Sequence, residues 1–159
     1  MADRSLCRDI VVQTACAPAL DDRPAIGGLL LWQDRENYLR LDRGVFGKDQ
    51  VTFMGAVANR DMVIGRGLLP AGASDQLFLR LERHGEQVQA FCSVDGGASD
   101  RTAGAQWLTV GQVTFPMDEP IQVGLHGIGS IDRAIYHGAY PEGTAIRFPS
   151  FELWEALAT

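Results

Sequence analysis

The clearest alternation of apolar and polar residues lies in the stretch Gln76-Leu77-Phe78-Leu79-Arg80-Leu81-Glu82-Arg83-His84-Gly85-Glu86-Gln87-Val88-Gln89-Ala90-Phe91-Cys92-Ser93-Val94. Leucines occupy the odd positions from 77 to 81, and apolar residues take every second position from 88 to 92. A period of two is that of a half-buried β-strand, whose successive side chains point to opposite faces. The stretch therefore predicts two antiparallel strands, at 76–83 and 87–94, joined as a hairpin.

The register of this hairpin is predicted from its turn. A two-residue turn at 84–85, with Gly85 in second place, suits a type I′ geometry. Residues whose numbers sum to 169 then face each other, with Leu81 opposite Val88, Leu79 opposite Ala90 and Leu77 opposite Cys92 on the core face, and Arg80 opposite Gln89 and Phe78 opposite Phe91 on the other. An aromatic pair among polar neighbours is the one feature of this hairpin that suggests a ligand surface.

The same alternation recurs along the whole chain, with Gly, Pro, Asn and Asp breaking it every 8 to 12 residues or so. The expected strands are 8–15, 26–33, 37–43, 50–58, 62–68, 76–83, 87–94, 107–113, 120–127 and 146–154. This spacing is typical of an all-β sandwich of two antiparallel sheets. Residues 1–159 are expected to form one such domain, with frayed ends at 1–7 and 156–159.

Composition and net charge limit the kinds of partner that the chain is expected to bind. The 159 residues are 46% hydrophobic and 21% charged, as in globular domains. A net charge of −6 gives phosphate backbones and anionic membrane surfaces little attraction, so neither nucleic acid nor a membrane is an expected partner. The longest apolar runs, such as 27–32, are far shorter than the ~20 residues of a membrane span. The N-terminus lacks the apolar core of a signal peptide, which favours a cytoplasmic location.

Three motifs together resemble a known group of sandwich domains. They are the first hairpin Gly27-Gly28-Leu29-Leu30-Leu31-Trp32-Gln33-Asp34-Arg35-Glu36-Asn37-Tyr38-Leu39-Arg40-Leu41, the segment Leu77-Phe78-Leu79-Arg80-Leu81-Glu82-Arg83, and Ser93-Val94-Asp95-Gly96-Gly97 followed by Trp107. The group is the concanavalin A-like domains called DUF1349 or regulation-of-enolase proteins, close to the C-terminal sandwich of family 43 glycoside hydrolases. The resemblance extends from about residue 8 to residue 154 and implies a jelly-roll fold, but it specifies function poorly, because members of the group are accessory or uncharacterised modules. The chain departs from the group's pattern in the insertion at 100–106.

No motif predicts catalysis or a metal site. Retaining glycosidases need two carboxylates about 5 Å apart, and no E-x-D-x-E strand occurs. The three histidines are far apart, so only His137, in the long loop after 129, is a weak ligand candidate, and His126 is expected to be a satisfied sheet histidine. Cys7, Cys16 and Cys92 lack the spacing of a disulfide framework, which favours buried free thiols. No cofactor is expected, although the resemblance leaves a structural calcium ion as an alternative.

Carbohydrate binding is the leading functional hypothesis, because sugars stack on aromatic rings while amide and charged side chains bond their hydroxyl groups. The predicted ligand-binding residues are Phe78, Phe91, Tyr38, Arg40, Gln89, Tyr136 and Tyr140, with Phe78, Phe91, Arg40 and Gln89 lining a concave sheet face. In the opposing interpretation both phenylalanines pack against the other sheet or a covering loop. Trp32, Trp107 and Trp154 are expected to be core or loop anchors. The alternative functions are a structural or protein-interaction module, as a homo-oligomer or part of a larger protein, and, less favoured, a hydrolase whose acids meet only in the fold.

Overall fold

The computed structural model describes residues 2–6, by their backbone only, and residues 9–20, 23–69, 76–94, 107–116, 119–129, 136 and 143–155. Its eleven strands are β1 (Ala2–Leu6), β2 (Ile10–Pro18), β3 (Gly27–Asp34), β4 (Asn37–Arg43), β5 (Gln50–Val57), β6 (Arg60–Leu68), β7 (Leu77–His84), β8 (Gln87–Ser93), β9 (Leu108–Thr114), β10 (Ile121–Gly127) and β11 (Ile146–Glu155). Nowhere in these ranges does the chain form a helix long and apolar enough to cross a membrane.

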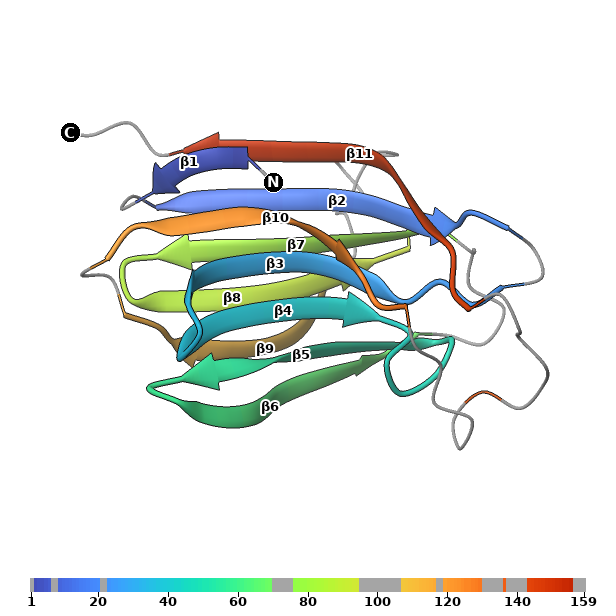
Figure 1. Ribbon diagram of the computed structural model, residues 1–159, viewed down its shortest axis with the longest axis horizontal. Helices are drawn as coiled ribbons and strands as arrows, with labels where there is room; N and C mark the ends of the chain where they lie inside the picture. The colour runs from blue at the N-terminus through green and yellow to red at the C-terminus, as the bar shows by residue number, and fades with distance from the viewer. Residues whose placement is uncertain are drawn as a thin grey trace.

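The strands form two antiparallel sheets that lie face to face (Figure 1). Sheet A has six strands in the order β1-β10-β3-β4-β5-β6, and sheet B has five in the order β11-β2-β7-β8-β9. Neighbouring strands are often distant in sequence, as when β10 pairs with β3 and β11 with β2. The predicted all-β jelly-roll sandwich is confirmed, and each of the ten expected strands is present.

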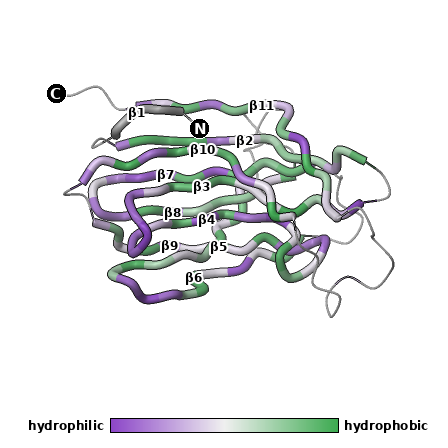
Figure 2. The backbone as a smooth tube through the Cα atoms, viewed as in Figure 1, coloured by the Kyte–Doolittle hydropathy of each residue, from purple (hydrophilic) through white to green (hydrophobic). Residues whose placement is uncertain are grey.

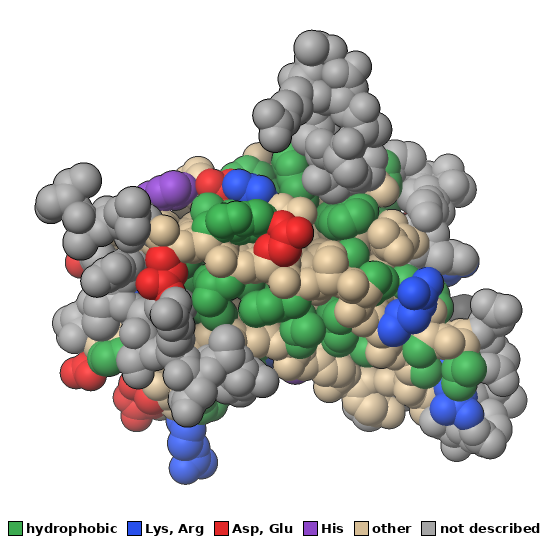
Figure 3. Space-filling model, turned by 90° about the horizontal axis from the view of Figure 1, so that it is seen from above, with side chains coloured by type: hydrophobic (Ala, Val, Ile, Leu, Met, Phe, Trp, Pro, Cys, Tyr) green, Lys and Arg blue, Asp and Glu red, His purple; other side chains and the backbone are tan. Residues whose placement is uncertain are grey.

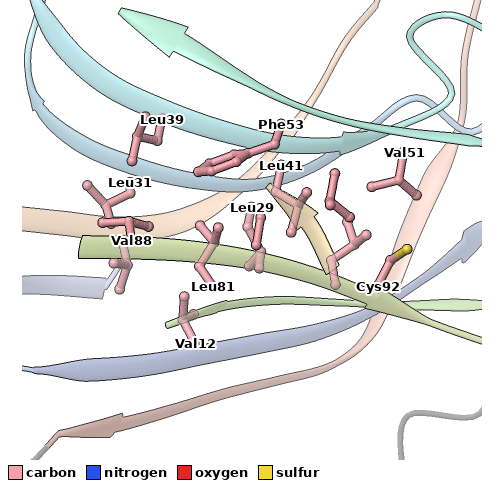
Figure 4. Close-up of a cluster of buried hydrophobic side chains, with 14 of the residues drawn as sticks. Val12, Leu29, Leu31, Leu39, Leu41, Val51, Phe53, Leu81, Val88 and Cys92 are labelled. Carbon is pink, nitrogen blue, oxygen red and sulfur yellow. The ribbon is translucent and has the colours of Figure 1, made fainter. Parts of the chain in front are cut away.

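The core lies between the sheets and follows from the alternation. Leu39 and Leu41 of β4 and Leu79 and Leu81 of β7 are all buried, whereas the residues between them face outward. Figure 2 shows the hydrophobic and hydrophilic positions alternating along these strands. In the close-up, side chains of both sheets point toward one another across the interior (Figure 4). Burial of these faces is the main source of stability, at about 1.5 to 3 kcal/mol for each large apolar side chain.

The predicted register of the central hairpin is wrong by two residues. Leu81 faces Ala90, Arg80 faces Phe91 and Phe78 faces Ser93, because the turn lies at 85–86 instead of 84–85. Gly85 has a φ of 62° and is the first of the two turn residues, as a type II′ turn requires. A shift of two leaves every side chain on its predicted face, since the side-chain period of a strand is also two.

The N-terminal end of the chain also differs from expectation, whereas 156–159 lie outside the described residues. Ala2–Leu6, expected to be frayed, form β1 at the edge of sheet A, where they pair with β10. At the same end of the sandwich, β11 is the edge strand of sheet B, and hydrophobic side chains are visible along this edge (Figure 3). Phe148, Phe151 and Leu153 of β11 pack against the core but stay partly accessible.

Candidate functional site

The predicted ligand residues divide between the two outer faces of the sandwich. Phe78, Phe91 and Gln89 belong to β7 and β8 and lie on the outer face of sheet B. Tyr38 and Arg40 belong to β4 and lie on the outer face of sheet A. The expectation that Arg40 lines the same surface as Phe78 is therefore wrong. Alternation tells which side chains avoid the core, but it does not tell which sheet a strand joins.

Of the two predicted loop tyrosines, the structure describes Tyr136. The Tyr136 hydroxyl donates a hydrogen bond to the carbonyl oxygen of Gly44, which follows β4 directly. Tyr136 is therefore a contact between its loop and the end of sheet A. Tyr140, His137 and the insertion at 100–106 lie outside the described residues.

Arg80 is the centre of the outer face of sheet B. Its Nη1 donates to Oε1 of Gln13 at 3.0 Å, and its Nε donates to Oε2 of Glu82 at 3.1 Å. Gln13 comes from the neighbouring strand β2, and Phe91 of β8 faces Arg80 on the other side. With 27% of the Arg80 side chain and 21% of the Glu82 side chain exposed, the guanidinium is held in place and still reaches solvent.

Two tryptophans approach Arg80 from the two edges of sheet B, one beside β9 and the other on β11. The Arg80 guanidinium carbon lies 5.6 Å from the ring centroid of Trp107, just before β9, and 6.0 Å from that of Trp154 on β11. These distances are those of cation–π contacts. Trp154 is 46% exposed and so retains a ring surface open to solvent. Sequence reasoning treated both as anchors, although the alternation of β11, with Leu153 inward, already placed Trp154 outward.

Phe78 and Phe91, two of the predicted ligand-binding residues, lie on the same face as Arg80. Both are partly buried on the outward side of sheet B, so they do not point between the sheets. Beside them, amide side chains bridge β8 and β9. Gln89 Nε2 donates to Gln112 Oε1 at 3.0 Å, and Gln112 Nε2 donates to Gln87 Oε1 at 2.8 Å. The glutamine side chains face solvent. We call the surface formed by these glutamines, Phe78, Phe91, Arg80, Trp107 and Trp154 the sheet B face.

Sheet A has a groove on its outer side. Its volume is about 390 Å³, and its lining residues are Tyr38, Arg40, Met54, Gly55, Asp61, Met62 and Val63. One wall is β4, the other is β6, and β5 lies between them. Tyr38 stacks on Trp32, with ring centroids 5.5 Å apart and planes at 23°. We call this feature the β4–β6 groove; Tyr38 and Arg40, predicted from the sequence, both line it.

A buried acid lies beside the groove. Asp42 is on the outer side of β4, yet its side chain has no exposed surface. The Arg40 Nε is 3.7 Å from Asp42 Oδ2, and the His126 Nε2 contacts Asp42 Oδ1. His126 and Asp42 are both paired with Gly28, which lies between them in the sheet. The carboxylate partner of His126 was not foreseen, because Asp42 is 84 positions away in sequence, a separation no local pattern can bridge.

The cysteines that the structure describes are inert by their surroundings. Cys16 and Cys92 are free and buried, as expected for core thiols. Burial raises the pKa of each thiol from 9.0 to about 11, opposed at Cys16 by the nearby Arg43 charge. Within the described ranges, histidine, cysteine and acidic side chains form no group of three or more that could hold a metal ion.

Comparison with known proteins supports the fold. Neither a protein-family model nor a curated protein sequence matches the chain. Among solved structures, a functionally unknown protein from Saccharomyces cerevisiae matches with a TM-score of 0.66 and 12% identity over 98% of this chain and 74% of that one. The carbohydrate-binding module CBM66 from Bacillus subtilis matches with a TM-score of 0.58 and 12% identity, over 97% and 78% of the two chains.

A glycoside hydrolase contains a similar domain. The GH43 protein BlXynB from Bacillus licheniformis matches with a TM-score of 0.67 and 11% identity over 94% of this chain, which corresponds to only 28% of the hydrolase. This chain thus spans less than a third of the enzyme's length. At these identities the likeness establishes a shared concanavalin-like sandwich fold, and function has to be argued from the faces themselves.

Proposed function

We propose that this chain is a non-catalytic carbohydrate-binding module whose glycan lies on the sheet B face. The observation that carries the proposal is Arg80, held by Gln13 and Glu82 between the rings of Trp107 and Trp154. The printed name of one structural neighbour, a carbohydrate-binding module, is consistent with it. The sequence motifs further lead us to place the chain with the DUF1349 group.

The chemistry of the face suits a sugar. The C–H side of a pyranose ring packs on an aromatic ring, and Trp154 offers one that is 46% exposed. Hydroxyl groups need both donors and acceptors, which Arg80, Glu82 and the amides of Gln89 and Gln112 supply. Hydrogen bonds between these side chains hold them in position before a ligand arrives, which lowers the entropic cost of binding.

The test is isothermal titration calorimetry with neutral hexaoses of xylose, arabinose, glucose, mannose and fructose, which measures the affinity of each. We expect at least one hexaose to bind and the Trp154→Ala variant to lose at least tenfold in affinity. Loss of one stacking ring costs about 1 to 3 kcal/mol in complexes with nucleic-acid bases, and we expect an effect of similar size for a sugar ring. Leu68→Ala is the matched control, because Leu68 is 74% exposed on β6, away from the sheet B face.

Binding that survives Trp154→Ala in a folded protein would place the glycan elsewhere. A chain that binds none of the hexaoses and elutes as a dimer would instead favour the alternative, an interaction module. Circular dichroism of each variant separates loss of binding from loss of fold.

A further inference from the structure

The β4–β6 groove has the dimensions and the walls of a small-ligand site. Tyr38 and Arg40 form one wall and Asp61 and Val63 the other, with Met54 on the strand between them. Two strand spacings separate β4 from β6, so the walls stand about 9 to 10 Å apart at the backbone. The volume of about 390 Å³ falls within the range of roughly 300 to 1,000 Å³ that is typical of small-ligand sites.

Two of the groove residues, Arg40 and Tyr38, are held by neighbouring side chains. Arg40 Nη2 approaches the sulfur of Met54 to 2.7 Å, and its Nε faces the buried carboxylate of Asp42. His126 holds Asp42 from the other side. The Tyr38 ring is braced by its stack on Trp32. A ligand therefore meets side chains that need little further ordering.

The charges favour a neutral ligand. The positive charge of Arg40 is compensated by Asp42, and Asp61 adds a second, exposed carboxylate at the opposite wall. These groups have no net positive charge in either protonation state of His126, so a ligand carboxylate or phosphate gains little and is repelled by Asp61. Hydroxyl groups suit both walls, because Asp61 accepts hydrogen bonds and Arg40 donates them.

We propose that the β4–β6 groove is a second carbohydrate site, which takes one neutral sugar unit against Tyr38, Asp61 and Arg40. It rests on the proposed function of the sheet B face and goes beyond it, because the two sites lie on opposite outer faces of one sandwich. The domain is then bivalent. A single copy links two glycan chains, and it gains avidity on a polysaccharide without any new contact.

The experiment is calorimetry of the full chain with the same neutral hexaoses, read as stoichiometry. We expect two hexaoses per chain for the wild type. Tyr38→Ala and Asp61→Asn should each reduce this to one, as should Trp154→Ala, and Tyr38→Ala with Trp154→Ala should abolish binding. Asp61→Asn keeps the size of an exposed side chain, so it tests the groove even if Tyr38→Ala fails to fold. Leu68→Ala, on β6 but outside the groove, should retain two.

The outcomes distinguish the two sites. One hexaose per chain, lost in Trp154→Ala and unchanged in Asp61→Asn, would overturn the groove site and leave the sheet B face standing. One hexaose per chain, lost in Asp61→Asn and unchanged in Trp154→Ala, would support the groove and overturn the sheet B face. Groove binding by galacturonate hexamers but not by neutral hexaoses would overturn the neutral ligand class. No binding of any hexamer would overturn both proposals.

Discussion

The two outer faces each present an arginine, but they hold it in different ways. On the sheet B face, Arg80 pairs with Glu82, and both side chains keep between a fifth and a third of their surface exposed. On sheet A, Arg40 pairs with Asp42, whose side chain is fully buried and also contacts His126. An exposed ion pair contributes little to stability, whereas a buried carboxylate depends on its partners. Both arginine side chains reach solvent, at 32% exposed for Arg40 and 27% for Arg80, so the difference lies in the carboxylate, which is accessible in Glu82 and fully buried in Asp42.

The largest difference in stability between the two faces is expected when each loses its described histidine that contacts a carboxylate, His126 on sheet A and His84 on sheet B. His126→Ala should lower the free energy of unfolding by about 2 to 4 kcal/mol, because it removes the histidine that contacts the fully buried carboxylate of Asp42. The matched control is His84→Ala. His84 contacts Glu82 and Asp9 but is 56% exposed, so its loss should cost less than about 1 kcal/mol. Urea unfolding of both variants measures the difference, and equal losses would remove the contrast.

A second comparison is between the outer faces and the interior, where the thiol of Cys16 is buried between the two sheets. It concerns stability at alkaline pH. Burial raises the pKa of Cys16 from 9.0 to about 11, so the unfolded thiol ionises at a pH where the folded thiol does not. This contribution to stability is fully present below pH 9 and is lost as the pH rises to about 11, with a size of about 2 to 3 kcal/mol. Urea unfolding from pH 8 to 11 should show a shallower decline in Cys16→Ala than in the wild type. Parallel declines would contradict the prediction.

The two arginines give a third and smaller test. Arg80→Gln should change the free energy of unfolding by less than about 1 kcal/mol, yet lower hexaose affinity at the sheet B face about tenfold. Arg40→Gln should cost more stability than Arg80→Gln, since it removes a partner of a fully buried carboxylate. Thermal melts and calorimetry on the same samples report both quantities. A reversed order of stability would mean that the sheet B face is the more tightly organised one.

The smallest effect is expected in the glutamine side chains of the sheet B face. Gln112→Ala removes hydrogen bonds to Gln87 and Gln89, but all three side chains are in exposed contacts. Water replaces these bonds, so the free energy of unfolding should change by no more than about 0.5 kcal/mol. A loss well above that in a chemical unfolding experiment would show that these amides hold β8 to β9.

Much of the fold could be predicted from local patterns. The leucines of β4 and β7 recur every second residue, and a strand can bury only one of its faces, so their inward direction followed from the sequence. The hairpin turn was misplaced because both 84–85 and 85–86 leave the core face intact and both place a positive φ at Gly85. A type I′ turn at 84–85 would also need a positive φ at His84, which His84 does not have. β1 was missed because its pairing with the edge of β10 is a long-range contact.

The sequence by itself determined ten of the eleven described strands and the inward direction of their core side chains, since both depend on a period of two within a few residues. It also contained the aromatic and amide residues of the sheet B face, although not their grouping. Only the tertiary structure decided that β4 and β7 belong to different sheets, that Trp107 and Trp154 meet at Arg80, and that His126 reaches Asp42. The physical reason is that sheet membership is set by pairing between segments far apart in the chain, and no local pattern carries that information.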